Sequence, residues 1–80
     1  MRLPRDVSGA GLVKALQKVG YSTVRQTGSH IRVSTSTPNE HRVTIPNHDL
    51  IKIGTLASIL DDIAKHLEID RSELLFLLRL

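Results

Sequence analysis

The sequence contains no cysteine and no tryptophan, and it has a single tyrosine and a single phenylalanine. Without cysteine, disulfides and thiolate chemistry are excluded. Two aromatic side chains do not build the stacking platform on which RRM and OB modules hold unpaired bases. No run approaches the roughly 18 apolar residues that span a bilayer, and the first residues lack the apolar stretch of a secretory signal. We therefore expect a cytoplasmic protein without a membrane partner.

Charge is unevenly distributed along the chain, although the net charge is only +3. Residues 1–52 contain eight Lys or Arg against three acidic residues, a net charge of +5, whereas residues 53–80 contain three against five, a net charge of −2. With 80 residues, we expect one domain, residues 1–80, built on one core. The first two thirds could face a polyanion such as RNA, but a solvated surface with a mild bias explains the charge equally well.

Hydrophobic periodicity predicts two helices separated by three strands. Ser8 is a candidate N-cap for a helix running to about Val19, and Gly20 ends it. The period then changes to two over 21–26, 30–34 and 41–45, with turns at "TG" and "STPNE" between them. Thr55 is a plausible cap for a second helix, and "DRSE" predicts a short C-terminal helix through a capping box.

The order of these elements predicts the fold class. An α-β-β-β-α order indicates an α+β fold in two layers, with helices on one face of a three-stranded antiparallel sheet and a short extra helix at the C-terminus. The other sheet face is then left open. Five leucines near the C-terminus are spread around that extra helix, so its apolar surface could pack on a partner, on a second copy or across the sheet edge.

Strand alternation predicts which side chains occupy the open face. Because Ile31 and Val33 suit the core, His30 and Arg32 should project to the opposite side. The same rule directs Arg42 outward from the third strand. If Val24 faces the core, Thr23 and Arg25 also lie outward. The open face would then collect one imidazole and three guanidinium groups.

Such a cluster has chemistry suited to RNA. The ribose 2′-hydroxyl is an internal nucleophile, so cleavage needs a group that moves protons and cations that hold the phosphate. Histidine exchanges protons near neutral pH, and arginine matches the geometry of a phosphate. A solvated surface histidine is the simpler alternative for His30. A metal site built from His30, His41 and His48 fits no familiar zinc spacing, and His66 is expected to be a surface residue.

Four segments, "SGAGLVKALQKVGY", "RQTGSHIRV", "VTIPNHD" and "IGTLASIL", resemble the HicA toxin family of small ribonucleases over about residues 8–76. The shared motifs are Gly-Ser-His, Pro-x-His and Gly-Thr-Leu. The resemblance implies a fold like a double-stranded-RNA-binding domain, cleavage of messenger RNA without a cofactor or metal, and inhibition by a HicB-type antitoxin. It also implies that His30 is the catalytic histidine, within a motif completed by Gly28 and Ser29.

Combining the resemblance with the open-face argument gives the site that we expect. His30 transfers protons, and RNA is bound through residues of the sheet and its first hairpin, with a secondary contribution from His48 and Lys52. We expect Gly28 to let the hairpin turn bend sharply and Ser29 to orient a phosphate, although hairpin chemistry alone explains Ser29 as well. The alternatives are a non-catalytic RNA-binding module and a surface plugged by another chain. The expected RNA-binding residues are Arg25, Gly28, Ser29, Arg32 and Arg42.

Overall fold

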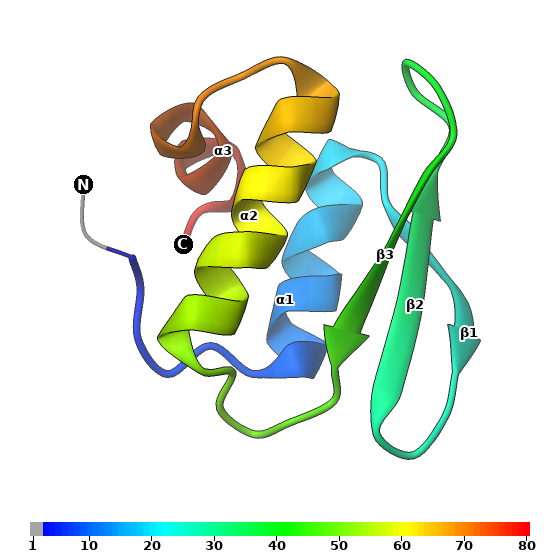
Figure 1. Ribbon diagram of the computed structural model, residues 1–80, viewed down its shortest axis with the longest axis vertical. Helices are drawn as coiled ribbons and strands as arrows, with labels where there is room; N and C mark the ends of the chain where they lie inside the picture. The colour runs from blue at the N-terminus through cyan, green and yellow to red at the C-terminus, as the bar shows by residue number, and fades with distance from the viewer. Residues whose placement is uncertain (1–2) are drawn as a thin grey trace.

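The computed structural model describes residues 3–80, in which three strands form one sheet and all helices lie on one side of it (Figure 1). The expected α+β class and element order are confirmed. The elements are α1 (Gly9–Leu16), the 3-10 turn η1 (Gln17–Val19), β1 (Ser22–Gln26), β2 (His30–Thr35), β3 (His41–Pro46), α2 (Ile53–Leu67) and α3 (Arg71–Leu78).

The sheet is antiparallel throughout, in the order β1-β2-β3. Ile31 pairs with Ile45 and Val33 with Val43, and all four side chains are buried, so one face of the sheet forms a wall of the core. His30, Arg32 and Ser34 alternate with them and lie on the other face, because side chains alternate along a strand. Strand alternation therefore predicts correctly which face of the sheet the side chains of β2 and β3 occupy.

A β-bulge in β1 breaks the same alternation. Arg25 is opposite Arg32, but Thr23 is opposite Val33, so Val24 is an extra residue without a partner. The condition that Val24 faces the core is not met, since its side chain is 57 % exposed. Thr23, opposite the buried Val33, takes the position on the core side of the strand, although its own side chain is exposed. Arg25, on the hairpin side of the bulge, keeps its expected outward position.

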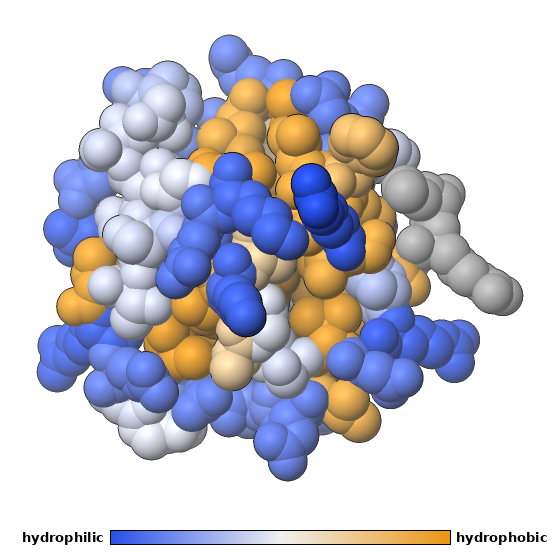
Figure 2. Space-filling model, turned by 180° about the vertical axis from the view of Figure 1, so that it is seen from behind, coloured by the Kyte–Doolittle hydropathy of each residue, from blue (hydrophilic) through white to orange (hydrophobic). Residues whose placement is uncertain are grey.

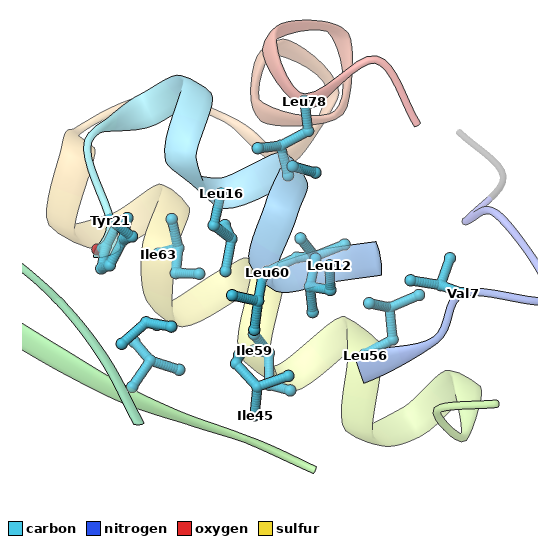
Figure 3. Packing of buried hydrophobic residues seen from close by; sticks show 14 of the residues in the cluster. Val7, Leu12, Leu16, Tyr21, Ile45, Leu56, Ile59, Leu60, Ile63 and Leu78 are labelled. Carbon is cyan, nitrogen blue, oxygen red and sulfur yellow. The ribbon is translucent and has the colours of Figure 1, made fainter. Parts of the chain in front are cut away.

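Helices α1 and α2 cover the inner sheet face and supply nine of the 19 buried hydrophobic residues of the core within residues 3–80 (Figure 3). Leu12, Leu16, Leu56 and Leu60 are fully buried there. The Ser8 hydroxyl accepts a hydrogen bond from the amide of Gly11 at 2.9 Å, as expected for an N-cap. Gly20 has φ 98°, the left-handed conformation that glycine adopts at low cost.

Helix α2 begins earlier than the sequence suggested. Its first residue is Ile53 and its N-cap is Lys52, so the expected cap at Thr55 is wrong. The cap at Asp70 is confirmed: its carboxylate accepts a hydrogen bond from the amide of Glu73 at 2.7 Å and opens α3.

Helix α3 packs on α2 and η1, on the side of the helical layer away from the sheet (Figure 1). It therefore does not lie across the sheet edge. Leu74, Leu75 and Leu78 are buried, whereas Phe76 is 79 % exposed. Viewed from behind, hydrophobic surface is concentrated over the helical side of the molecule (Figure 2). None of the helices in residues 3–80 is long and apolar enough to cross a membrane.

Candidate ribonuclease site

His30 is the first residue of β2 and is exposed on the open face of the sheet. Its neighbour Ile31 is buried, so the strand turns the imidazole away from the core. The backbone partner of His30 across the sheet is Pro46, the last residue of β3. A core-filling role for this histidine is therefore excluded.

Around His30 the sheet forms a shallow, open cavity of about 400 Å³. Every side chain on its wall is polar or cationic: the lining residues are Arg25, Thr27, His30, Arg32 and Thr44. Arg25 and Arg32 face each other on neighbouring strands, and Thr44 is opposite Arg32 on the third. All three strands thus contribute to one basic hollow with a single imidazole at its edge.

The turn between β1 and β2 fixes the start of the histidine strand. The amide of Thr27 donates to the carbonyl of His30 at 2.8 Å, and the amide of His30 donates to Thr27 Oγ1 at 3.2 Å. Ser29 Oγ lies 3.1 Å from His30 Nδ1, a hydrogen bond that holds one ring nitrogen, and no residue among 3–80 forms a hydrogen bond with Nε2. Ser29 therefore contacts the imidazole, a role that the sequence did not indicate.

Gly28 lies in the same turn but has no left-handed backbone conformation, and a Cβ built on it meets no atom within 4 Å. The bend at this position therefore does not depend on the conformational freedom of glycine. What glycine does provide is open space beside Ser29 and His30.

Five of the expected residues are not on the cavity wall: Gly28 and Ser29 lie in the adjoining turn, and the other three are Arg42, His48 and Lys52. Arg42 projects from the open face but forms an ion pair with Glu40 at 2.7 Å. His48 is exposed in the loop after β3, and its carbonyl accepts a hydrogen bond from the amide of Gly9 at 2.9 Å. Lys52 is the exposed N-cap of α2. The structure therefore groups Arg25, Arg32 and Ser29 with His30. It does not bring Arg42, His48 or Lys52 into that group.

Sequence reasoning missed Asn47, which lies beside the histidine turn. Its amide donates to the carbonyl of Ser29 at 2.9 Å, and its side-chain Nδ2 donates to the carbonyl of Gly28 at 3.2 Å. The only signal in the sequence was its place between Pro46 and His48. One residue of the loop after β3 thus binds both carbonyls at the tip of the first hairpin.

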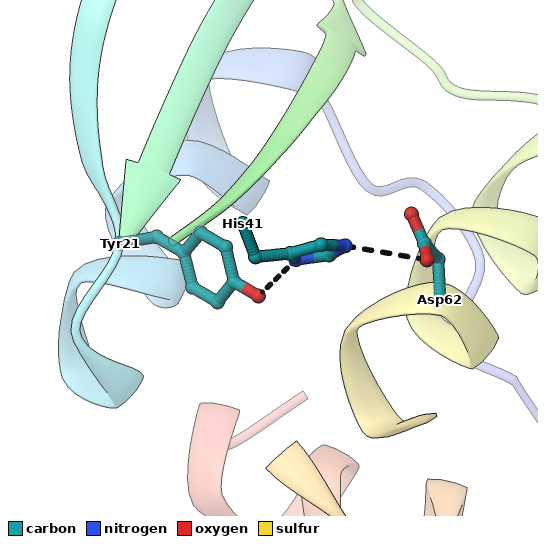
Figure 4. Close-up of polar contacts among 3 residues, drawn as sticks. All are labelled: Tyr21, His41 and Asp62. Atoms are coloured by element: carbon teal, nitrogen blue, oxygen red, sulfur yellow. Dashed lines mark hydrogen bonds and ion pairs between the residues drawn. The ribbon is translucent and has the colours of Figure 1, made fainter. Parts of the chain in front are cut away.

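A second polar cluster lies at the opposite end of the sheet (Figure 4). His41 Nδ1 is 2.6 Å from the Tyr21 hydroxyl, and His41 Nε2 is 3.3 Å from Asp62. The His66 ring stacks on His41 with centroids 4.4 Å apart, so His66 is half-buried rather than the surface residue that we expected. Burial, with a smaller effect of Asp62, raises the pKa of Tyr21 to about 12. This cluster ties β3 and the start of β1 to α2.

The histidines do not gather into a metal site. His30 and His41 are the first residues of antiparallel neighbours, so they lie at opposite ends of the sheet. Among residues 3–80, no group of three or more His, Asp or Glu side chains is arranged to hold a metal ion. The candidate site is therefore the basic cavity alone.

Fold and site together define a class: a small α+β protein with a fold like that of a double-stranded-RNA-binding domain and a basic open sheet face that carries one exposed imidazole. The family model described as the HicA toxin of bacterial toxin-antitoxin matches residues 9–67. The chain belongs to the HicA toxin family, whose members act as ribonucleases, and the family implies an RNA substrate and a cognate antitoxin. Searches of the curated proteins and of the solved structures found no significant match.

Proposed function

We propose that this protein is a metal-independent endoribonuclease that cleaves messenger RNA with His30 as its one catalytic histidine. The observation that supports it is the cavity in which an exposed imidazole lies beside two guanidinium groups from adjacent strands. RNA supplies its own nucleophile, so the protein needs only to move protons and to stabilise charge on the phosphate.

In the proposed reaction, neutral His30 accepts the proton of the ribose 2′-hydroxyl through Nε2, while Nδ1–H donates to Ser29 Oγ. The 2′-oxygen then attacks the adjacent phosphorus, and the bond from phosphorus to the 5′-oxygen breaks. The departing 5′-oxygen takes a proton from water, which reaches the open cavity. The products are a 2′,3′-cyclic phosphate and a free 5′-hydroxyl, and His30 returns its proton to solvent.

Arg25 and Arg32 hold the phosphate in this proposal. They occupy facing positions on β1 and β2, so both guanidinium groups can reach one phosphate or two neighbouring ones. No carboxylate lines the cavity to compete for them. As negative charge builds on the phosphate oxygens during attack, these fixed cations stabilise the transition state more than the ground state.

The donors in the cavity support the proposed metal independence. Its wall offers one imidazole, two threonine hydroxyls and two guanidinium groups. Magnesium is bound through carboxylate oxygens, and catalytic zinc requires about three protein ligands. The guanidinium groups take the charge-stabilising role that a metal has in other nucleases.

We also propose that a HicB-type antitoxin neutralises the protein by covering the open sheet face. Membership of the family implies a cognate antitoxin. The cavity is shallow and cationic, so an acidic surface laid over Arg25 and Arg32 would exclude RNA without any change in the fold.

The test is cleavage of an RNA oligonucleotide in EDTA by the wild-type protein and by His30→Ala. Loss of a proton-transfer group should slow cleavage by about 10²- to 10⁴-fold, and circular dichroism should remain unchanged because His30 is exposed. His48→Ala, an exposed histidine outside the cavity wall, is the comparison and should lose far less activity.

A second substrate tests the internal nucleophile. An oligonucleotide with a single 2′-deoxyribose at the cleaved position should resist, and its cleavage would point to attack by water. If His30→Ala cuts RNA as fast as the wild type, the proposal is wrong. Salt-sensitive binding of RNA with no product in any variant would favour the non-catalytic binding module instead.

A further inference from the structure

Two carbonyls at the tip of the first hairpin are bound by a residue that is distant in sequence. The turn's internal hydrogen bonds join Thr27 to His30 and the Ser29 hydroxyl to the His30 ring. None of them holds the carbonyls of Gly28 and Ser29, which are instead bound by the side chain and the amide of Asn47, at 3.2 and 2.9 Å.

Asn47 is itself held in place by the start of α1. The amide of Gly9 donates to the carbonyl of His48 at 2.9 Å. A Cβ built on Gly9 would lie 2.0 Å from the carbonyl oxygen of Pro46 and 3.0 Å from the Cα of Asn47, so helix and loop are in direct backbone contact. The loop after β3 therefore packs directly against the start of α1 and can support the hairpin tip.

The hairpin tip needs such a support because of its composition. Gly28 has open space around it, and glycine has more conformational freedom than any other type of residue. The next residue, Ser29, provides the hydroxyl that lies 3.1 Å from His30 Nδ1. A change in the backbone at Gly28 or Ser29 would move that hydroxyl and release the imidazole.

We infer that Asn47 is a positioning residue for His30, acting through Gly28 and Ser29 and touching neither the RNA nor the imidazole. The inference rests on the proposed function of His30. Its side-chain amide fixes the turn, the turn fixes the Ser29 hydroxyl, and that hydroxyl fixes the ring whose free nitrogen takes the 2′-hydroxyl proton. Misplacement of a reacting group by about 1 Å can cost about 10²-fold in rate, so a looser ring should be a slower base.

The experiment measures kcat and KM for Asn47→Ala and Asn47→Asp beside Asn39→Ala. Asn39 is an exposed asparagine in the loop before β3, at the far end of the sheet, and is the matched control. Asn47→Ala keeps the backbone hydrogen bond to Ser29 and loses the one to Gly28. Its kcat should fall about 10-fold with KM changed less than about threefold, and Asn39→Ala should match the wild type.

Asn47→Asp retains the shape of the side chain but sets a carboxylate oxygen against the carbonyl of Gly28. It should be at least as slow as Asn47→Ala, and it serves as the second variant if the alanine protein is poorly folded. A wild-type kcat in both variants, or a rise in KM alone, would show that Asn47 does not position the catalytic group.

A double mutant tests whether the effect passes through His30. If it does, Asn47→Ala should slow the His30→Ala protein no further, since the group that it positions is already gone. Additive losses would overturn the inference.

Imidazole ¹⁵N NMR spectra separate failure of this inference from failure of the proposed function. In Asn47→Ala the balance of the two ring tautomers of His30 should shift, because Ser29 no longer holds Nδ1 in one geometry, and in Asn39→Ala it should not. If His30→Ala proves fully active, the proposed function fails. The NMR comparison then still decides whether Asn47 orders the ring: an unchanged His30 spectrum in Asn47→Ala overturns the positioning claim.

Discussion

Replacing Gly9 with alanine should destabilise this protein, although alanine is the better helix former. Glycine inside a helix costs about 0.5–1 kcal/mol relative to alanine, so a Gly→Ala change at a free helical position stabilises by about that amount. At Gly9 the added Cβ would lie 2.0 Å from the carbonyl oxygen of Pro46. That neighbour is backbone and cannot rotate away, so α1 or the loop after β3 must move.

The size of the effect follows from these two opposing contributions. Forcing an extra carbon into a packed region typically costs about 1–3 kcal/mol, and here the shift also strains the hydrogen bond from the amide of Gly9 to the carbonyl of His48. Because the clash is with backbone, we take the upper part of that range, about 2–3 kcal/mol. Subtracting about 1 kcal/mol for the gain in helix propensity leaves an expected loss of about 1–2 kcal/mol of unfolding free energy for Gly9→Ala. For a domain of this length that corresponds to about 4–16 °C in Tm.

Gly54 is the matched control for this prediction. It is the second residue of α2, as Gly9 is the first of α1, but a Cβ built there meets no atom within 4 Å. Gly54→Ala should therefore raise the free energy of unfolding. Urea unfolding of both variants, followed by circular dichroism, gives the two signs directly. A Gly9→Ala protein as stable as the wild type would refute the claim that helix and loop are in rigid backbone contact.

Two further predictions concern titration and salt. Because the pKa of Tyr21 is raised to about 12 from 10.0, the folded protein keeps the phenolic proton that the unfolded chain loses. The stability from this group is complete below pH 10 and is lost as the pH rises through 12. The free energy of unfolding, measured in urea, should therefore fall over that interval for the wild type and not for Tyr21→Phe. Removing Arg25 or Arg32 should weaken RNA binding and lower the slope of log K against log salt by about one each. Arg5→Ala, on the N-terminal segment, is the control and should leave the slope unchanged. An equal slope in all of these proteins would exclude a phosphate contact in the cavity.

Much of the fold could be predicted because its signals are local. The outward direction of His30 follows from its buried neighbours Ile31 and Val33, and the cap at Asp70 follows from the residue types in the next turn. The start of α2 was missed because Lys52, its N-cap, makes no side-chain capping hydrogen bond that the sequence could reveal.

Contacts between distant segments could not be predicted in the same way. Asn47 and Gly28 are 19 positions apart, and only the pairing of β2 with β3 brings them together. Likewise, nothing local distinguishes His41, bound between Tyr21 and Asp62, from an exposed histidine. Alternation along one strand says which face a residue takes, and it says nothing about which loop will reach that residue.

The bulge in β1 marks the point at which strand alternation stops predicting the face of a side chain, and it explains why the cavity is basic. Counted from the hairpin, Arg25 and Arg32 face each other on the open side, and the pairing is regular up to that point. If pairing were instead counted without a break from Thr23 and Val33, Arg25 would be opposite Ile31 and would lie toward the core. The unpaired Val24 absorbs this difference of one residue. The side chain of Val24 is left exposed as a result, and Arg25 of β1 places its guanidinium group on the face that carries His30.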